Sequence, residues 1–593
     1  MATEKNSKKY IVIIDQDKIE PELARETVIN YDPLNRAGKE GGFYIDENEE
    51  LHINDEDVME AHKMAVNKYP YDGAIQMVQL VYEEGDQVHQ FGENEFRLYG
   101  LPSPDEDAVV GILGENGLGK TVASKILSGK LMPNLGEYED PPEWKEIQEK
   151  FRGTGLQNHI KKLADDEMDS ATKPQQVERI PDVFSGTVEE FLTRESRPEN
   201  FEELTEKFEL KKLLERPVEN LSGGELQRLA IAATIGSEAE FYVFDEPSSF
   251  LDVKQRLKSG HEIRGLDGAV MTIEHDLATL DLISDRINIF YGENGSYGMV
   301  SNSLSSKKGI NQYLDGHIPS QNLKIRNDSI DFERSEGDRG TGQTTLEYET
   351  MEKDFGEGEF ELETSGGTLK EDEIIGIIGE NGLGKTVFAK MLAGGLESDE
   401  GESPEASIAY KSQYIEASDV KVEDAFPSDA NMNTKRFQTR IEEPLELEPL
   451  YERKLNNLSG GELQRVAVAM CLSRNADAYL LDEPSAFLDV ESRVKLGKTL
   501  RRFSRKEEKP LMVIDHDLLL LDYISDRGIV FRGEPGVKGE STSPMPTSEA
   551  LNEFLKEVDM TFRKDPSTGR PRANKPGSQK DEEQRKSGEF YET

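Results

Sequence analysis

Residues 108–127, AVVGILGENGLGKTVASKIL, are typical of a buried strand, a glycine-rich loop and a helix, and residues 374–392, IIGIIGENGLGKTVFAKML, repeat the pattern. The loop fits G-x-x-x-x-G-K-[ST], whose backbone N–H groups surround phosphates while the lysine reaches the β- and γ-phosphates and the hydroxyl reaches Mg²⁺. The helix N-terminus adds a positive end to the same anion site. The predicted nucleotide ligands in these loops are Gly114, Glu115, Asn116, Gly117, Leu118, Gly119, Lys120 and Thr121, and Gly379, Glu380, Asn381, Gly382, Leu383, Gly384, Lys385 and Thr386.

The chain also repeats itself outside these loops. LSGGELQR occurs at 221–228 and 458–465, and FDEPSSFLD at 244–252 is echoed by LDEPSAFLD at 481–489. In both copies 23 residues separate the serine of the first motif from the first aspartate of the second. A period this long indicates two copies of one α/β domain rather than a solenoid.

Two apolar strands end in Asp-Glu, at 241–246 and 478–483. Asp245 and Asp482 are predicted to hold Mg²⁺. Glu246 and Glu483, one residue further on, are predicted to polarise the attacking water. Strand-terminal acids often cap helices or face solvent, but behind a phosphate loop the catalytic interpretation is favoured.

LSGGE opens a helix in each copy, and a helix N-terminus with two glycines is another anion site. The motif resembles the signature of ABC-type ATPases, whose two domains pack head to tail so that one ATP lies between the loop of one domain and the signature of the other. The resemblance pairs Lys120 with Ser459 and Lys385 with Ser222. It adds as ATP ligands Ser222, Gly223, Gly224, Ser459, Gly460 and Gly461.

Further motifs match the same family. His275 and His516 match the switch histidine at the γ-phosphate and join the predicted catalytic residues, and Gln157 and Gln413 match the glutamine near Mg²⁺, although extra residues disturb the spacing of Gln157. The predicted Mg²⁺ ligands are thus Thr121, Gln157, Asp245, Thr386, Gln413 and Asp482.

Two other motifs are aromatic. Segments 250–252 and 487–489 match the loop that couples the two sites. Phe91 and Phe355 precede the phosphate loops, where the family stacks a ring on adenine; core packing is the alternative.

Three segments indicate which subfamily of ABC ATPases the chain resembles. Lys120 and Ser222 lie 102 residues apart but Lys385 and Ser459 only 74, so the first copy holds extra residues, which we place at 144–181 as two short helices around a loop. This insert, the connection at 292–345 and the tail at 541–593 resemble the helix-loop-helix and hinge segments of ABC subfamily E, the ribosome-recycling RNase L inhibitor family of archaea and eukaryotes. The resemblance covers essentially the whole chain and favours the archaeal type.

We therefore predict an α/β protein with two tandem P-loop ABC-type domains behind a small α+β ferredoxin-like domain. The expected boundaries are 1–80 for the ferredoxin-like domain, 81–300 for the first copy, 301–345 for the hinge, 346–540 for the second copy and 541–593 for the C-terminal hinge segment.

The N-terminal domain departs from the family, which holds two [4Fe–4S] clusters there with eight cysteines. The chain has one cysteine, Cys471, expected to be a small buried apolar residue on the helix after the second signature. Because clusters of this type need thiolates, we predict that iron–sulfur clusters are absent and that a packed core replaces them. Asp32 and His62 alone do not make a metal site. The aligned ligand positions hold Ile19, Ala24, Val28, Asp32, Met59, His62, Ala65 and Tyr69.

The composition is strongly acidic, with 118 Asp plus Glu against 71 Lys plus Arg and a net charge of −47. The charge is spread along the chain, which favours a hydrated surface of the halophilic type over a basic partner. No apolar run approaches the roughly 20 residues of a membrane span, and the cysteine usage fits a cytoplasmic protein. The tail carries a local basic island, expected either to meet RNA phosphates or to pack on the acidic copies: Arg563, Lys564, Arg570 and Arg572.

The resemblance implies an ATP- and Mg²⁺-dependent ATPase that splits ribosomes into subunits after termination. Its implied partners are the small ribosomal subunit, through rRNA and protein, a release factor and initiation factors; we expect a monomer with paired copies and no membrane contact. A non-catalytic ribosome-binding or translation-initiation scaffold is the alternative, followed by a transporter ATPase subunit. A subfamily F translation ATPase should lack the N-terminal unit and the hinges.

Overall fold

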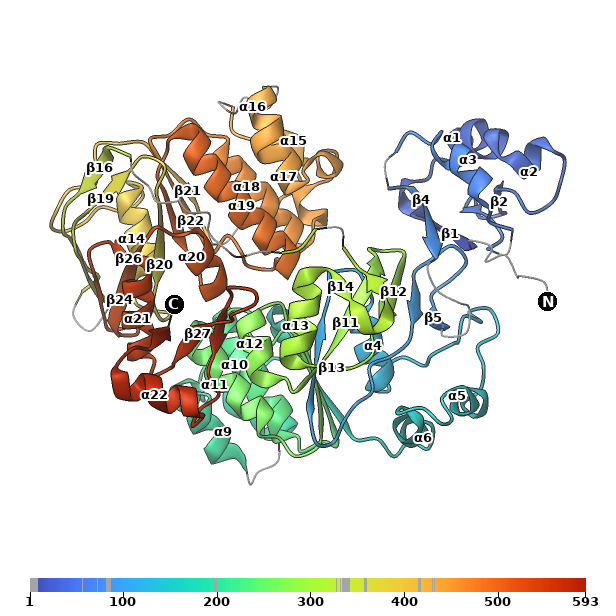
Figure 1. Ribbon diagram of the computed structural model, residues 1–593, viewed down its shortest axis with the longest axis horizontal. Coiled ribbons are helices and arrows are strands. Elements are labelled where there is room, and N and C mark those ends of the chain that lie inside the picture. The colour runs from blue at the N-terminus through green and yellow to red at the C-terminus, as the bar shows by residue number, and fades with distance from the viewer. Residues whose placement is uncertain are drawn as a thin grey trace.

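The computed structural model describes residues 9–55, 57–71, 73–80, 87–196, 200–326, 328–330, 332, 342–356, 360–413, 417–428, 430, 432 and 434–592. Figure 1 shows a small N-terminal domain, two larger α/β domains and a C-terminal segment that lies against both of them. Within these ranges, every helix is too short or too polar to traverse a lipid bilayer.

The first copy is built on a nine-stranded sheet whose central strands are parallel. These strands are buried along their whole length because helices cover both faces, which explains their unbroken apolar sequences. Helices α4 (Lys120–Leu127) and α10 (Gly223–Gly236) begin at the phosphate loop and at the signature. The strand order is β5 (Gln87–Gln90), β6 (Arg97–Tyr99), β12 (Tyr297–Val300), β11 (Arg286–Glu293), β7 (Val109–Leu113), β10 (Ala269–Ile273), β9 (Phe241–Asp245) and β8 (Ser170–Lys173), with β13 (Leu304–Ser305) beside β11.

The second copy repeats this topology strand for strand, which confirms the tandem α/β architecture. Its helices α14 (Lys385–Leu392) and α18 (Gly460–Leu472) again start at loop and signature, and Cys471 on α18 is buried as expected. The order is β17 (Met351–Asp354), β18 (Glu361–Thr364), β25 (Lys538–Ser541), β24 (Arg527–Glu534), β20 (Ile374–Ile378), β23 (Leu511–Ile514), β22 (Ala478–Asp482) and β21 (Ile408–Lys411), with β26 (Met545–Pro546) beside β24.

The extra residues of the first copy form α5 (Trp144–Lys150) and α6 (Gln157–Ala164), at the edge of the copy in Figure 1. The predicted insert 144–181 extends too far, because β8 already belongs to the sheet and pairs with β9. In the second copy β21 occupies the same position without such helices before it.

The N-terminal domain packs on the first copy through β1 (Lys9–Ile14), which pairs with β4 (Ile75–Leu80). Ile11 is buried against Tyr99 and Tyr297 of the first copy, and the Ile14 amide donates to the Asn94 carbonyl at 3.0 Å. The domain's other elements are short: α1 (Pro21–Ala24), a π-helical turn (Arg25–Ile29), α2 (Pro33–Arg36), α3 (Lys63–Val66), β2 (Tyr44–Ile45) and β3 (Leu51–His52).

The hinge and the tail lie between the copies. The hinge contains α13 (Ser306–Asp315), which packs on β11, and a short β14–β15 ribbon (His317–Ile318 and Leu323–Lys324). The tail begins with α21 (Thr547–Glu557) on the second copy and continues as a three-stranded sheet that contacts helices α12 (Leu277–Ile283) and α20 (Leu518–Ile524), one from each copy. Its elements are β27 (Phe562–Lys564), β28 (Pro571–Ala573), α22 (Gln579–Ser587) and β29 (Tyr591–Glu592).

Candidate active sites

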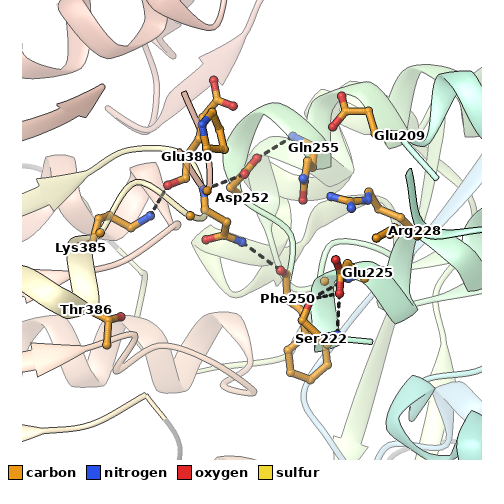
Figure 2. Close-up of a pocket in the computed structure, with 18 of the residues that line it drawn as sticks. Glu209, Ser222, Glu225, Arg228, Phe250, Asp252, Gln255, Glu380, Lys385 and Thr386 are labelled. Atoms are coloured by element: carbon orange, nitrogen blue, oxygen red, sulfur yellow. Dashed lines mark hydrogen bonds between the residues drawn. The ribbon is translucent and has the colours of Figure 1, made fainter. Parts of the chain in front are cut away.

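Two cavities lie between the copies, and each is lined by the phosphate loop of one copy and the signature of the other. The first, of about 760 Å³, joins Lys120 and Thr121 to residues 459–461. The second, of about 1040 Å³, joins Lys385 and Thr386 to residues 222–224. Figure 2 shows this second cavity, with Ser222 and Phe250 on the side opposite Lys385. The structure therefore brings together the pairs that the head-to-tail arrangement predicts.

Each phosphate loop wraps around the ammonium group of its own lysine. Lys120 Nζ donates to the Gly114 and Glu115 carbonyls at 2.6 and 2.8 Å. Lys385 Nζ makes the same contacts in the second copy, at 2.8 and 2.7 Å. Burial lowers the pKa of Lys120 to about 8. Both loops thus hold a cation at the centre of a ring of backbone groups, as phosphate binding requires.

The threonine and aspartate predicted for Mg²⁺ lie together in both copies. Thr386 Oγ1 donates to Asp482 Oδ2 at 2.8 Å, and Thr121 Oγ1 lies 3.5 Å from Asp245 Oδ2. Burial, with help from the neighbouring Glu246, raises the pKa of Asp245 to about 6. Hydroxyl and carboxylate oxygens are ligands that Mg²⁺ accepts, so both sets fit this ion.

The predicted catalytic glutamates face the predicted histidines. His275 Nε2 lies 3.6 Å from Glu246 Oε1, and His516 Nε2 lies 3.4 Å from Glu483 Oε1. Burial holds the pKa of His275 well below its usual value, so this ring is neutral at physiological pH. Each site therefore presents a carboxylate next to an imidazole at the cavity wall.

The prediction that Gln157 lies at the first site is wrong. Gln157 lies on α6, where its Oε1 accepts from the Gly153 amide at 2.7 Å. Gln175 instead donates to Glu246 Oε1 at 2.7 Å, as Gln413 does to Glu483 Oε1 at 2.8 Å. In each copy an edge strand ends in a lysine that stands two residues before the glutamine. This shared Lys-x-Gln spacing identifies Gln175 as the counterpart of Gln413.

The two aromatic residues predicted to contact adenine are placed differently in the two copies. Phe91 lines the first cavity and is 48% exposed. Phe355 is also exposed, but the described residues that line the second cavity include Phe360 and not Phe355. Phe96 and Phe360, which the sequence did not single out, lie against the loop glycines: a Cβ on Gly119 would come within 2.8 Å of the Phe96 ring. These rings therefore require glycine at that loop position.

The coupling loops cross from one copy to the other. Asp252 Oδ2 accepts from the Asn381 amide at 3.0 Å, and Asp489 Oδ2 accepts from the Asn116 amide at 3.5 Å. The rings of Phe250 and Phe487 pack edge to face between them, with centroids 5.5 Å apart. Each loop thus contacts the phosphate loop of the opposite copy.

The basic island of the tail faces protein, and the expectation of RNA contact is wrong for its central residues. Arg570 is fully buried and lies 3.2 Å from Asp281 of α12, which also pairs with Arg572. Lys564 pairs with Asp522 of α20 at 3.1 Å. Arg563 donates to the side chain of Asn574 within the tail. The alternative expectation, packing on the acidic copies, is confirmed for Lys564, Arg570 and Arg572.

The aligned cluster positions of the N-terminal domain do not fit an iron–sulfur cluster. Ala24, Val28 and Ala65 are fully buried in its apolar core. Asp32 accepts from the amides of residues 34, 35 and 43, so its oxygens are already used by the backbone. The Tyr69 hydroxyl bridges the Glu20 amide and the Lys18 carbonyl, at 2.7 and 3.1 Å. These five positions therefore belong to the packed interior of the domain, whereas Met59 is 41% exposed.

Comparison with known proteins agrees with this geometry. A family model described as ABC transporter matches residues 104–249 and 362–486. An uncharacterized ABC transporter ATP-binding protein of Methanocaldococcus jannaschii is 45% identical over 588 residues, covering 98% of this chain and 97% of that protein. Translation initiation factor RLI1 of Chaetomium thermophilum is 39% identical over 603 residues, with 98% and 97% covered.

A solved structure gives the same result in three dimensions. It is described as a model of ribosome-bound archaeal Pelota and ABCE1, and it matches with a TM-score of 0.91 and 43% identity, over 99% of this chain and 100% of that one. Full-length similarity at this level, together with two composite nucleotide sites, leads to one assignment. The chain belongs to subfamily E of the ABC ATPases, the RNase L inhibitor family, and hydrolyses ATP.

Proposed function

We propose that this protein is a ribosome recycling factor that uses ATP to split ribosomes into subunits after termination and then stays on the small subunit. The observation that carries the proposal is the pair of composite cavities, each of which needs both copies to surround one nucleotide. A nucleotide that contacts both copies favours the closed arrangement by its differential affinity for it. The similarity to a ribosome-bound structure supports the ribosome as the object on which closure acts.

In each site the residues take complementary roles. Lys120 and Lys385 bind the β- and γ-phosphates, and Ser459 and Ser222 contact the same nucleotide from the opposite copy. Mg²⁺, when bound, neutralises phosphate charge; Thr121 with Asp245, and Thr386 with Asp482, would hold it. The glutamates orient and deprotonate the attacking water, while the histidines and glutamines keep their carboxylates in place. Loss of the γ-phosphate then removes the contact with the opposite signature, and the copies separate.

The contact between the N-terminal domain and the first copy supports a role for this domain in transmitting the movement. Its strand β1 packs on the first copy, and its Asp55 pairs with the guanidinium of Arg97 from that copy. We propose that this domain works without iron–sulfur clusters and that closure of the copies drives it against the ribosome. Release factor, rRNA and proteins of the small subunit, and initiation factors are the proposed partners, with the protein acting as a monomer in the cytoplasm.

Sedimentation through a gradient tests the proposal. Purified ribosomal subunits and whole ribosomes are mixed with the protein in the presence of ADP, ATP or a non-hydrolysable ATP analogue. We expect the analogue to retain the protein on small subunits, and the Glu246→Gln and Glu483→Gln variants to prolong that association with ATP. Identical sedimentation under all nucleotide conditions would contradict a motor.

A translation-initiation scaffold is the second candidate, because a 39% identical relative bears the name translation initiation factor. In that case small-subunit binding would persist in the glutamate variants while splitting of whole ribosomes would not depend on ATP turnover. The amounts of free subunits released per ATP hydrolysed separate the two functions.

A further inference from the structure

We propose that Lys173 and Lys411 are positioning residues that fix the backbone of the two hydrolytic glutamates. The proposal rests on the hydrolytic role of Glu246 and Glu483 given above. Neither lysine belongs to the motifs that the sequence singled out. Both stand at the end of an edge strand, two residues before the glutamine of each site.

Each lysine spans the carbonyls of the Asp-Glu pair in its own copy. Lys173 Nζ donates to the Asp245 carbonyl at 2.7 Å and to the Glu246 carbonyl at 3.0 Å. Lys411 Nζ donates to the corresponding carbonyls of Asp482 and Glu483, at 2.8 and 3.3 Å. The same two-carbonyl contact thus occurs twice in the molecule.

Both side chains are buried, so their ammonium groups are removed from water. Lys173 is 0% exposed and Lys411 is 4% exposed. Removing an ammonium group from water is strongly unfavourable unless strong hydrogen bonds replace its hydration. An apolar residue at the end of a parallel strand would fill this space without that cost, so the contact to the carbonyls is what a lysine adds here.

The backbone that these lysines hold is unusual. Glu246 and Glu483 have φ values of 49° and 46°, in the left-handed region that non-glycine residues rarely occupy. The amide of Glu246 donates to the Ile273 carbonyl at 2.9 Å, and Gln227 donates to the Glu246 carbonyl at 2.8 Å. With the lysine, these bonds fix the turn that aims the carboxylate at the glutamine and histidine of the site.

This geometry predicts a specific kinetic effect. Without the ammonium group the turn can relax, and the carboxylate moves away from the attacking water while the phosphate loop stays intact. We therefore expect kcat to fall about 10–100-fold in the double variant Lys173→Met/Lys411→Met, since misplacement of a catalytic group by about 1 Å costs this much. The KM for ATP and the affinity for a non-hydrolysable analogue should change less than threefold.

The matched controls are Lys162→Met and Lys421→Met, which remove surface lysines of the same two copies that are 40% and 43% exposed at the side chain. They should leave kcat unchanged. Lys173→Arg/Lys411→Arg keeps donors for both carbonyls and should retain more activity than the Met variant. Thermal unfolding of every variant establishes that the compared proteins are folded, and the single variants Lys173→Met and Lys411→Met are compared with wild type if the double variant does not fold.

The outcomes separate the inference from the proposed function. If Glu246→Gln/Glu483→Gln abolishes turnover, and folded Lys173→Met/Lys411→Met loses kcat while it still binds the analogue as wild type does, the positioning role is supported. If the glutamate variants lose activity but folded Met variants keep wild-type kcat, the inference fails and the proposed function stands. If analogue binding falls as much as kcat, the lysines support the nucleotide site generally and the inference is wrong. Full turnover in the glutamate variants would overturn both.

Discussion

Lys254 Nζ lies 3.0 Å from Glu380 Oε1, an ion pair between the helix after one coupling loop and the phosphate loop of the other copy. The equivalent position across the pseudo-twofold interface holds two acids, because Glu491 replaces the lysine and faces Glu115. These carboxyl groups share a hydrogen bond. Arg326 of the hinge reaches Glu491 Oε2 at 3.4 Å and relieves part of the repulsion. Closure of the second site therefore brings together an attractive ion pair, whereas closure of the first site brings together two acidic groups.

This difference makes closure of the first site pH-dependent. Burial, then the hydrogen bond and charge of Glu491, raise the pKa of Glu115 from 4.5 to about 7. Since the group regains its ordinary pKa when the copies separate, closure binds a proton; its contribution is complete below pH 4.5 and is lost as the pH rises through 7. Closure by a non-hydrolysable analogue should be about tenfold weaker at pH 8 than at pH 6.

Energy transfer between fluorophores on the two copies measures this effect. Glu115→Gln should remove the pH dependence and leave closure at pH 8 as strong as at pH 6. Glu380→Gln, at the matched position, loses the attraction to Lys254 but should keep the wild-type pH dependence. Superimposable closure curves of the wild type at both pH values would rule out proton uptake by the pair.

The tail forms an ion-paired clasp on the first copy, and Asp281→Asn should release it. The substitution leaves Arg570 buried without its counter-charge, which costs about 3–5 kcal/mol in tail docking. Asp522→Asn is the matched control, because its partner Lys564 is 35% exposed at the side chain and the loss should stay below about 1 kcal/mol. Hydrogen exchange of residues 560–592 reports the difference; equal protection in both variants would show that Asp281 does not hold the tail.

Short contiguous motifs explain why so much of the site was predictable. The phosphate loops, the Asp-Glu pairs and the signatures carry their chemistry within a few neighbouring residues, so the sequence showed them before any fold was known. Gln157 was misassigned because the extra helices lengthen the sequence between the phosphate loop and the glutamine, whereas the Lys-x-Gln pattern at the end of the edge strand marks Gln175. The partners Arg570 and Asp281 stand 289 residues apart, and Glu115 and Glu491 meet only through domain pairing. Such contacts depend on tertiary packing alone.

The N-terminal domain should contain no iron or acid-labile sulfide after either aerobic or anaerobic purification. Its core uses Asp32 to bind three backbone amides, so Asp32→Ala should destabilise this domain by about 1–2 kcal/mol. Iron chelators should leave the unfolding of the domain unchanged. Iron approaching stoichiometric amounts, with the visible absorbance of a cluster, would contradict a cluster-free core.

The coupling loops allow a substitution that separates local from interdomain contacts. Asp252 uses Oδ1 to cap α11 (Val253–Arg264) through the Gln255 amide at 2.9 Å, and Oδ2 to reach the Asn381 amide of the opposite copy at 3.0 Å. Serine keeps the cap, since its hydroxyl serves at this position, but is too short to cross the interface. Asp252→Ser should therefore leave thermal stability within about 0.5 kcal/mol of wild type and still weaken closure around the second site.

The matched change is Asp489→Ser, whose cap on α19 (Val490–Glu507) is equivalent but whose contact to the Asn116 amide is longer, at 3.5 Å. Because a hydrogen bond weakens with this increase in distance, we expect the smaller effect here. Single-turnover hydrolysis in each variant, with the opposite site blocked by its own Glu→Gln substitution, measures the two contributions separately. An effect of Asp489→Ser equal to or larger than that of Asp252→Ser would mean that the two loops transmit closure by something other than these amide contacts.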